Sequence, residues 1–197
     1  MNAELSAEIA AAAARLVVDE GMEYAAAKRK AARDLGRRSG RAGELPSNEA
    51  VEDEVRDYIA LFCAETQPGE LRALRELALV WMERLAEFRP HLGGAVWRGT
   101  ATRLSCVMLD LYCDDPKAPE IAFLNQGLDF DSGGSAGDAD FSVLSIAARS
   151  TALNDWVTVH CLVHDHDDLR GALKPDAHGR SWRGDAKALR RLLEIPT

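Results

Sequence analysis

The side chains best suited to chemistry gather in one short run, HCLVHDHDD, which spans His160 to Asp168. Imidazole nitrogens and carboxylate oxygens are the ligands that zinc, manganese and non-haem iron take from proteins. His164, His166 and Asp168 fall within this run, and we therefore treat them as a candidate metal site. The run also suits the start of a helix or turn at Asp168, because acidic side chains interact favourably with the amides exposed there.

A second stretch, HLGGAVWRGTATRLSCVMLDLYCDD, runs from His91 to Asp115 and combines glycine-rich turns with a strand-like segment. The glycines alone, in the pattern G-G-x-x-x-R-G, indicate only tight turns. A long amphipathic helix is expected before them, and Ser105 stands where the strand-like segment begins. This combination of helix, turn and strand indicates a site built around the glycines.

From Pro90 to Leu109 the chain resembles the signature of the DNA polymerase beta-like nucleotidyltransferase superfamily, especially its minimal bacterial members, P-x-L-F-G-S-x-A-R-G-x-A-x-x-x-S-D-I-D-L. The alignment needs no gap, Val107 replaces an isoleucine, and the matching residues are Pro90, Leu92, Gly94, Arg98, Gly99, Ala101, Ser105 and Leu109. The resemblance implies a short strand, a turn that holds nucleotide phosphates, and a second strand with two metal-binding aspartates. It thereby implies nucleotide or phosphate binding by Gly93, Gly94, Arg98, Gly99 and Ser105.

The sequence departs from this signature where the family carries its chemistry. Ala95 replaces the serine of the Gly-Ser pair, and Cys106 and Met108 replace the two aspartates. Magnesium prefers carboxylate and phosphate oxygens to sulfur, so we expect neither the usual metal pair nor any other cofactor. The leading hypothesis is a degenerate, non-catalytic nucleotidyltransferase-like protein that binds a nucleotide or a protein partner.

Asp110 keeps one carboxylate on the same side of this strand, because side chains two residues apart share a face. The alternative hypothesis is an active nucleotidyltransferase that moves a nucleoside monophosphate from a nucleoside triphosphate to an acceptor. Asp110 would then be catalytic and bind Mg²⁺ or Mn²⁺ with an Asp or His from a neighbouring strand. A second carboxylate beside it, such as Glu120 or Asp129, would favour this alternative. A second alternative is a metal-dependent enzyme or sensor that uses His164 and His166.

A basic segment before the C-terminal helix offers further phosphate-binding groups, namely Arg170, Lys174, Arg180, Trp182 and Arg183. Guanidinium groups bind phosphate, and a tryptophan can stack on a base. Arg98 would join this group if the fold brings the two loops together. The simpler interpretation is a solvated loop before the final helix.

The elements that must position these residues fall into two parts. Helical periodicity predicts a first helix that ends before Gly21 and further helices over 23–35, 48–62 and 68–88. Beyond residue 90, β-like runs at 106–113, 120–125, 140–148 and 156–164 predict a sheet, with a polar loop at 131–140 and a final helix at 185–194. We expect an α+β protein, with a helical region at 1–88 packed on a mixed-sheet nucleotidyltransferase-like part at 89–197.

The composition limits the classes of partner. The chain has 197 residues and a formal net charge of -8, so nonspecific nucleic-acid binding is not expected unless basic residues gather on one face. Apolar runs are too short for a membrane span, and the cytoplasm is the expected location. The four cysteines lack C-x-x-C spacing, which indicates reduced core thiols rather than a zinc ribbon.

Overall fold

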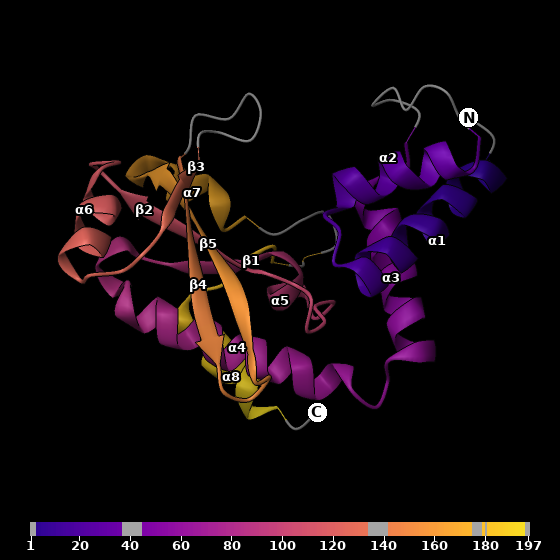
Figure 1. Ribbon diagram of the computed structural model, residues 1–197. Coiled ribbons are helices and arrows are strands. Elements are labelled where there is room, and N and C mark those ends of the chain that lie inside the picture. The colour runs from indigo at the N-terminus through magenta and orange to yellow at the C-terminus, as the bar shows by residue number, and fades with distance from the viewer. Residues whose placement is uncertain (1–2, 37–44, 134–141, 175–178, 180, 196–197) are drawn as a thin grey trace. The chain divides into compact units, whose positions relative to one another are not determined.

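The computed structural model has the expected α+β architecture, with helices first and a sheet after them (Figure 1). It describes residues 3–36, 45–133, 142–174, 179 and 181–195. The chain divides into two compact units, Met1–Pro68 with Thr100–Leu104, and Gly69–Gly99 with Ser105–Thr197. The change from helices to strands occurs near residue 90, but most of helix α4 (Gln67–Arg84) belongs to the unit with the sheet.

The first unit is built from three helices, α1 (Ala3–Glu20), α2 (Tyr24–Asp34) and α3 (Asn48–Phe62). Ser47 caps α3, because its hydroxyl accepts a hydrogen bond from the backbone N–H of Ala50 at 3.0 Å. One apolar core joins the three helices, with buried Ile9, Ala13, Ala27, Val51 and Val55 among its members. No helix in the described ranges is both long and apolar enough to cross a membrane.

The second unit contains a mixed sheet, whose strands lie in the order β1-β2-β5-β4-β3. The strands are β1 (His91–Gly93), β2 (Val107–Cys113), β3 (Asp131–Gly133), β4 (Ser142–Ser150) and β5 (Asp155–Asp165). β2 and β5 are parallel, whereas the other neighbouring pairs are antiparallel. The register places Asp110 opposite His91 on β1 and Tyr112 opposite His164 on β5.

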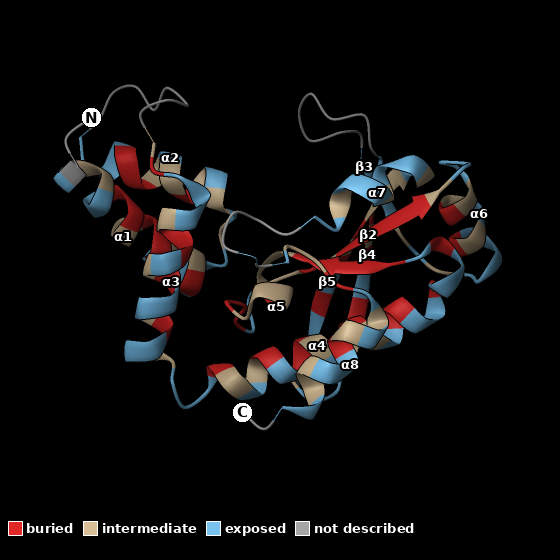
Figure 2. Cartoon of the chain, turned by 180° about the vertical axis from the view of Figure 1, so that it is seen from behind, coloured by how far each residue is buried: buried red, intermediate tan, exposed pale blue. Residues whose placement is uncertain are grey.

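One face of this sheet is apolar and buried, with Val107, Leu109, Leu111, Val159, Cys161 and Val163 among its side chains. Figure 2 shows α4 and α8 (Ala186–Glu194) running together beside the sheet. An ion pair of 2.6 Å between Arg190 and Glu83 joins the two helices. They contribute buried Leu74, Met82 and Leu189, so the core of this unit lies between the helices and the sheet.

The opposite face, which we call the polar face, carries Met108, Asp110, Tyr112, Ser145, His160, Leu162 and His164. Side chains alternate along a strand, so these residues take turns with those of the apolar face. His160, Leu162 and His164 are only half-buried. The polar face is therefore the side of the sheet on which ionisable groups can meet a ligand.

Residues 120–125 do not form the expected strand. They belong to helix α6 (Ala118–Asn125), in which Pro119 lies in the first turn, where its fixed φ suits a helix. Phe123 is buried, whereas Ile121 and Leu124 are exposed. An apolar run this short does not distinguish a strand from a partly buried helix, and this explains the error.

The polar segments expected as loops are only partly described. The segment expected at 131–140 begins with the edge strand β3, which pairs with β4. Residues 134–140, and most of the segment between α2 and α3, lie outside the described residues. The final helix was expected at 185–194 and occurs as α8, with the Asp185 side chain capping it through the backbone N–H of Ala188 at 2.7 Å.

Candidate functional site

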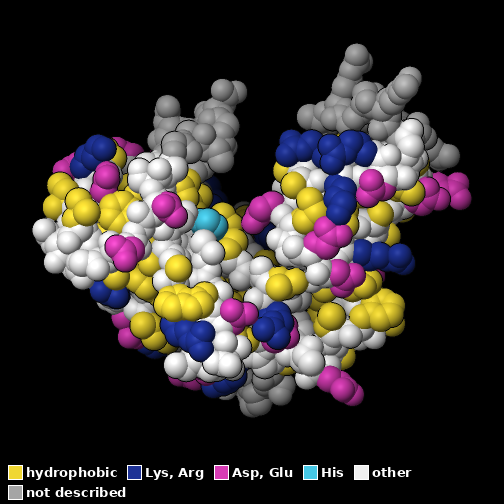
Figure 3. All heavy atoms as spheres, viewed as in Figure 1, with side chains coloured by type: hydrophobic (Ala, Val, Ile, Leu, Met, Phe, Trp, Pro, Cys, Tyr) yellow, Lys and Arg dark blue, Asp and Glu magenta, His cyan; other side chains and the backbone are white. Residues whose placement is uncertain are grey.

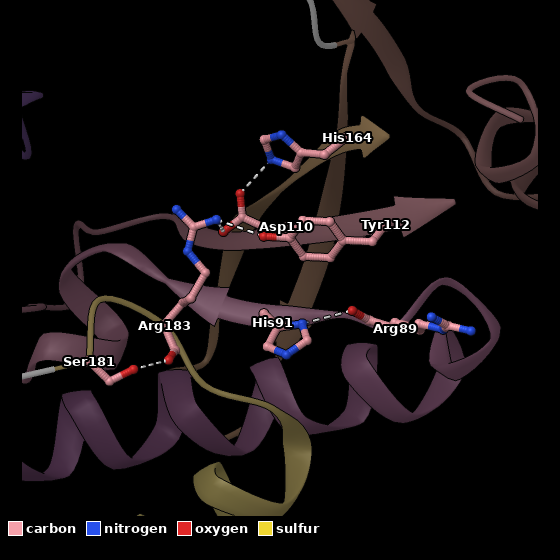
Figure 4. A network of polar contacts seen from close by, with 7 residues as sticks. All are labelled: Arg89, His91, Asp110, Tyr112, His164, Ser181 and Arg183. Atoms are coloured by element: carbon pink, nitrogen blue, oxygen red, sulfur yellow. Dashed lines mark hydrogen bonds and ion pairs between the residues drawn. The ribbon is translucent and has the colours of Figure 1, made fainter. Parts of the chain in front are cut away.

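Asp110 lies at the centre of the polar face and is only 7% exposed. Its Oδ1 accepts a hydrogen bond from Nε2 of His164 at 2.7 Å, and its Oδ2 lies 3.4 Å from Nη1 of Arg183. Figure 4 shows the carboxylate between the imidazole and the guanidinium. A buried carboxylate needs such partners, because an unpaired charge away from water is costly.

The parallel pairing of β2 and β5 brings His164 to this carboxylate. Tyr112 is the register partner of His164, and Asp110 precedes Tyr112 by two residues on the same face. The rings of Tyr112 and His164 stack with centroids 5.3 Å apart and planes inclined by 23°. The stacked imidazole then reaches back along β2 to Asp110.

Tyr112 adds a phenol to the site. Its hydroxyl accepts a hydrogen bond from Nη1 of Arg183 at 2.7 Å. Burial raises the pKa of Tyr112, and the carboxylate of Asp110 raises it further, whereas the bond from Arg183 acts in the opposite direction. At neutral pH the group is therefore a protonated phenol.

His91 closes the site on the β1 side. It begins the glycine-rich stretch but was not among the site residues predicted from the sequence. Its ring meets that of Tyr112 edge-on, with centroids 5.5 Å apart and an interplanar angle of 83°. Nδ1 of His91 donates to the backbone carbonyl of Arg89 at 2.9 Å (Figure 4). A carbonyl only accepts, so the neutral ring has its acceptor nitrogen at Nε2.

The segment 181–184 carries Arg183 to the sheet. Its last residue, Gly184, exchanges two backbone hydrogen bonds with Leu92 of β1, at 2.8 and 3.0 Å. The indole N–H of Trp97 donates to a carbonyl of the same segment at 2.8 Å. A Cβ on Gly184 would lie 2.1 Å from the Trp97 ring, so this close approach requires glycine.

The glycine turn implied by the nucleotidyltransferase resemblance lies against the polar face. Gly93 ends β1, and Gly94 begins the short helix α5 (Gly94–Arg98) with a φ of 65°. A Cβ on Gly93 would lie 3.3 Å from Oδ2 of Asp110, and one on Gly94 would lie 3.2 Å from the sulfur of Met108. The turn and Asp110 thus belong to one neighbourhood.

The basic segment and the glycine turn do come together. The guanidinium of Arg98 lies over the indole of Trp182, 5.4 Å from the ring centroid. Gly99 ends α5 in the left-handed conformation, and Ser105 is half-buried ahead of β2. Of the other basic residues, Arg170 and Lys174 are exposed, and Arg180 lies outside the described residues.

The three candidate metal ligands, His164, His166 and Asp168, do not lie on one element. His164 is bonded to Asp110 on the polar face, whereas His166 and Asp168 lie in the 3-10 helix η3 (His166–Asp168), which leads into α7 (Leu169–Ala172). Within the described part of the chain, no group of three or more His, Cys, Asp or Glu is placed to hold a metal ion.

The surroundings of His166 are those of a capped turn. Asp165 caps η3, since its carboxylate accepts from the backbone N–H of Asp167 at 2.8 Å. Nε2 of His166 accepts a hydrogen bond from the guanidinium of Arg89. Its Nδ1 lies 4.0 Å from carboxylate oxygens of Asp114 and Asp167, which is beyond hydrogen-bond distance.

The donors on the polar face do not fit a pair of magnesium ions. The positions that the resemblance assigns to two aspartates hold the sulfur atoms of Cys106 and Met108, which are poor ligands for magnesium. The carboxylate of Asp110 already faces a guanidinium and an imidazole. Glu120 lies in α6, where it pairs with Lys117 at 3.4 Å, and Asp129 is exposed.

We call the group formed by His91, Asp110, Tyr112, His164 and Arg183 the Asp110 cluster. It combines one carboxylate, two imidazoles, a phenol and a guanidinium on three strands and one loop. These groups can orient a polar ligand by hydrogen bonds and can exchange a proton with it through an imidazole. No family model, curated protein or solved structure matches the chain.

Proposed function

We propose that this chain is a non-catalytic, nucleotidyltransferase-like protein that binds a nucleotide on the polar face of its sheet. The observation that carries the proposal is the meeting of Arg98 and Trp182 beside the Gly93–Gly94 turn. A guanidinium binds phosphate oxygens through paired N–H groups, and an indole offers a flat surface for a base. The two ends of a nucleotide therefore have complementary groups next to each other.

The order of elements also supports the proposal. A long helix, α4, comes before β1, the short α5 follows at the glycine turn, and β2 returns antiparallel to β1. The resemblance implies the same succession of helix, short strand, turn and second strand. The nucleotide would lie over the turn, where the missing Cβ atoms of Gly93 and Gly94 leave room close to the backbone.

Two features support a binding role without the usual catalysis. Cys106 and Met108 provide no oxygen ligand for the metal ions on which the family's reaction depends. Asp110 is paired with Arg183, and a metal ion at this carboxylate would meet the repulsion of the guanidinium. We expect a bound nucleotide to be held intact.

The test is thermal unfolding of the full chain with ATP, GTP, CTP or UTP, first with a chelator and then with Mg²⁺ or Mn²⁺. A ligand at about 100 times its dissociation constant adds roughly 2.7 kcal/mol to the free energy of unfolding. Stabilisation by at least one nucleotide in the presence of the chelator is expected. Stabilisation only with metal would point to an active nucleotidyltransferase, and no shift with any nucleotide would overturn nucleotide binding and favour a protein partner.

The matched variants are Arg98→Gln and Arg149→Gln. The guanidinium of Arg149 also lies over a tryptophan ring, that of Trp156, 5.9 Å from its centroid. Trp156 is six residues along β5 from Leu162, the register partner of Asp110. At strand rise this separation is roughly 20 Å. Arg98→Gln should abolish the stabilisation and Arg149→Gln should preserve it. An equal loss in both variants would contradict a site at the glycine turn.

A second candidate function is acid–base catalysis by His164, which the 2.7 Å bond to Asp110 favours. A carboxylate at one ring nitrogen fixes the imidazole's orientation and tautomer and leaves the other ring nitrogen for proton transfer. Any nucleotide that binds should then be followed for turnover by phosphorus NMR. A reaction abolished by His164→Gln, but retained in His160→Gln, would establish this function. His160 is the matched control because it shares the polar face and bonds to the Ser145 hydroxyl at 2.8 Å.

A further inference from the structure

Positive charge is concentrated in the sequence at positions 28–41, a stretch that begins within helix α2 and lies far along the chain from the Asp110 cluster. Seven Lys or Arg and one acidic residue occupy positions 28–41, which gives this stretch a charge of +6. The remaining 183 residues therefore carry -14 in a chain of net charge -8. Segregation of this size creates a local positive field within an acidic protein. Figure 3 shows the cationic side chains gathered along α2.

Two of the cations on α2 are occupied by contacts within the first unit. Nζ of Lys28 donates to the carbonyl of Pro46 at 3.0 Å and to Oδ1 of Asn48 at 2.8 Å. Lys30 pairs with Glu20 at 2.6 Å. These bonds tie α2 to α1 and to the start of α3, and they make the helix a firm support for its other side chains.

Arg29 and Arg33 are the two cations that point outward. Both are exposed and one helical turn apart, whereas Ala27, Ala31 and Ala32 bury the opposite side of α2. Their guanidinium groups make no hydrogen bond or ion pair with any residue in the described ranges. At helical rise the two residues are about 6 Å apart along the axis. The pair thus presents two forked donors in a row on a fixed helix.

We propose that Arg29 and Arg33 bind the phosphate backbone of a nucleic acid. A guanidinium group can bind one phosphate through two parallel N–H···O hydrogen bonds. Two such groups in a row suit successive phosphates along a nucleic-acid strand. Helices that bind a membrane surface place Trp, Phe or Leu beside their cations, but the apolar residues of α2 are mainly alanines turned into the unit. The acidic remainder of the chain repels a polyanion and confines the contact to this helix.

The test is fluorescence anisotropy of the full chain with labelled single-stranded RNA, single-stranded DNA and duplex DNA, from about 50 to 200 mM salt. Arg29→Gln/Arg33→Gln is compared with Lys187→Gln/Arg191→Gln, an exposed pair with the same spacing on α8. Glutamine keeps helix propensity, and thermal unfolding verifies that both variants are folded. The two variants lose the same charge.

The wild type should bind at low salt and weaken steeply as salt rises. Loss of two phosphate contacts should weaken single-strand binding about tenfold at about 50 mM salt and reduce the salt slope by about 1.4. The α8 variant should stay close to the wild type, and a preference between RNA and DNA would identify the natural source of the backbone. The proposal is overturned by equal weakening in both variants or by no wild-type binding at low salt. In a parallel titration with anionic phospholipid vesicles, binding to the vesicles alone would also overturn it.

Discussion

Asp110 and His164 stand 54 residues apart in the sequence and meet through a 2.7 Å hydrogen bond across two parallel strands. Strands that pair in parallel need a long crossover between them, and here that crossover includes α6 and the β3–β4 pair. The contact therefore reports the correct register of β2 on β5. It also joins the part of the site that comes from the glycine-turn region to the part that comes from the histidine-rich run.

Removing the carboxylate of Asp110 should destabilise the fold. Asp110→Ala removes the carboxylate that Arg183 and His164 contact, and we expect a loss of about 2–4 kcal/mol because this group is buried but not fully enclosed. Asp110→Asn retains an acceptor for His164 and should lose about 1–2 kcal/mol. Urea unfolding measures both. Asp114→Asn, whose side chain is 94% exposed, should change little; a loss as large as that of Asp110→Asn would count against the cluster.

Gly184→Ala should separate the 181–184 segment from β1. The new Cβ would lie 2.1 Å from the Trp97 ring, and the repacking should cost about 1–3 kcal/mol. Denaturant unfolding, with tryptophan fluorescence as the probe, measures the change. Gly171→Ala is the control, because nothing lies within 4 Å of its added Cβ. In a Trp97→Leu background the cost should shrink, and an unchanged cost would show that the two residues are not coupled.

Tyr112 should give the free energy of unfolding a distinct dependence on alkaline pH. Burial raises the pKa of Tyr112, so the folded chain keeps the phenolic proton to a higher pH than the unfolded chain does. The resulting contribution of Tyr112 to the free energy of unfolding is complete below about pH 10, the ordinary pKa of tyrosine. It is lost as the pH rises through the higher pKa of Tyr112 in the folded chain. Tyr112→Phe removes it, so the advantage of the wild type over the variant should fall above about pH 10. Parallel profiles for the two proteins would contradict this assignment.

Cys161 should resist alkylation in the folded protein. Burial raises the pKa of its thiol to about 12, and the thiolate is the species that reacts. Mass spectrometry after brief iodoacetamide treatment near pH 8 should find Cys161 unmodified, and unfolding in urea should expose it. Modification of folded Cys161 as fast as that of the half-buried Cys106 would show that the apolar face opens readily.

The periodic features of the sequence predicted much of the fold. Apolar spacing located the helices of the first 88 residues, and alternation along β2 placed Asp110 and Tyr112 opposite Leu109 and Leu111. These predictions succeed because the backbone itself sets periods of 3.6 and 2 residues. The strand expected at 120–125 was wrong, since a short run of apolar residues is compatible with either period.

The site needed information that no local pattern contains. The contact between Asp110 and His164 depends on which strands are neighbours, and His91 joins only because β1 pairs antiparallel with β2. The approach of Arg183 depends on the backbone bonds between Gly184 and Leu92. The sequence predicted that Arg98 would join the basic segment around Trp182 if the fold brought the two loops together, and that condition is a property of the tertiary fold.

The pairing of Gly184 with Leu92 has a consequence for the order of folding. β4 and β5 adjoin in sequence and can form a hairpin early, whereas Gly184 and Leu92 are 92 residues apart, and such distant contacts close late. Arg183 reaches Asp110 only through this closure. During synthesis Asp110 therefore has no ion pair with Arg183 until almost the whole of the second unit has left the ribosome.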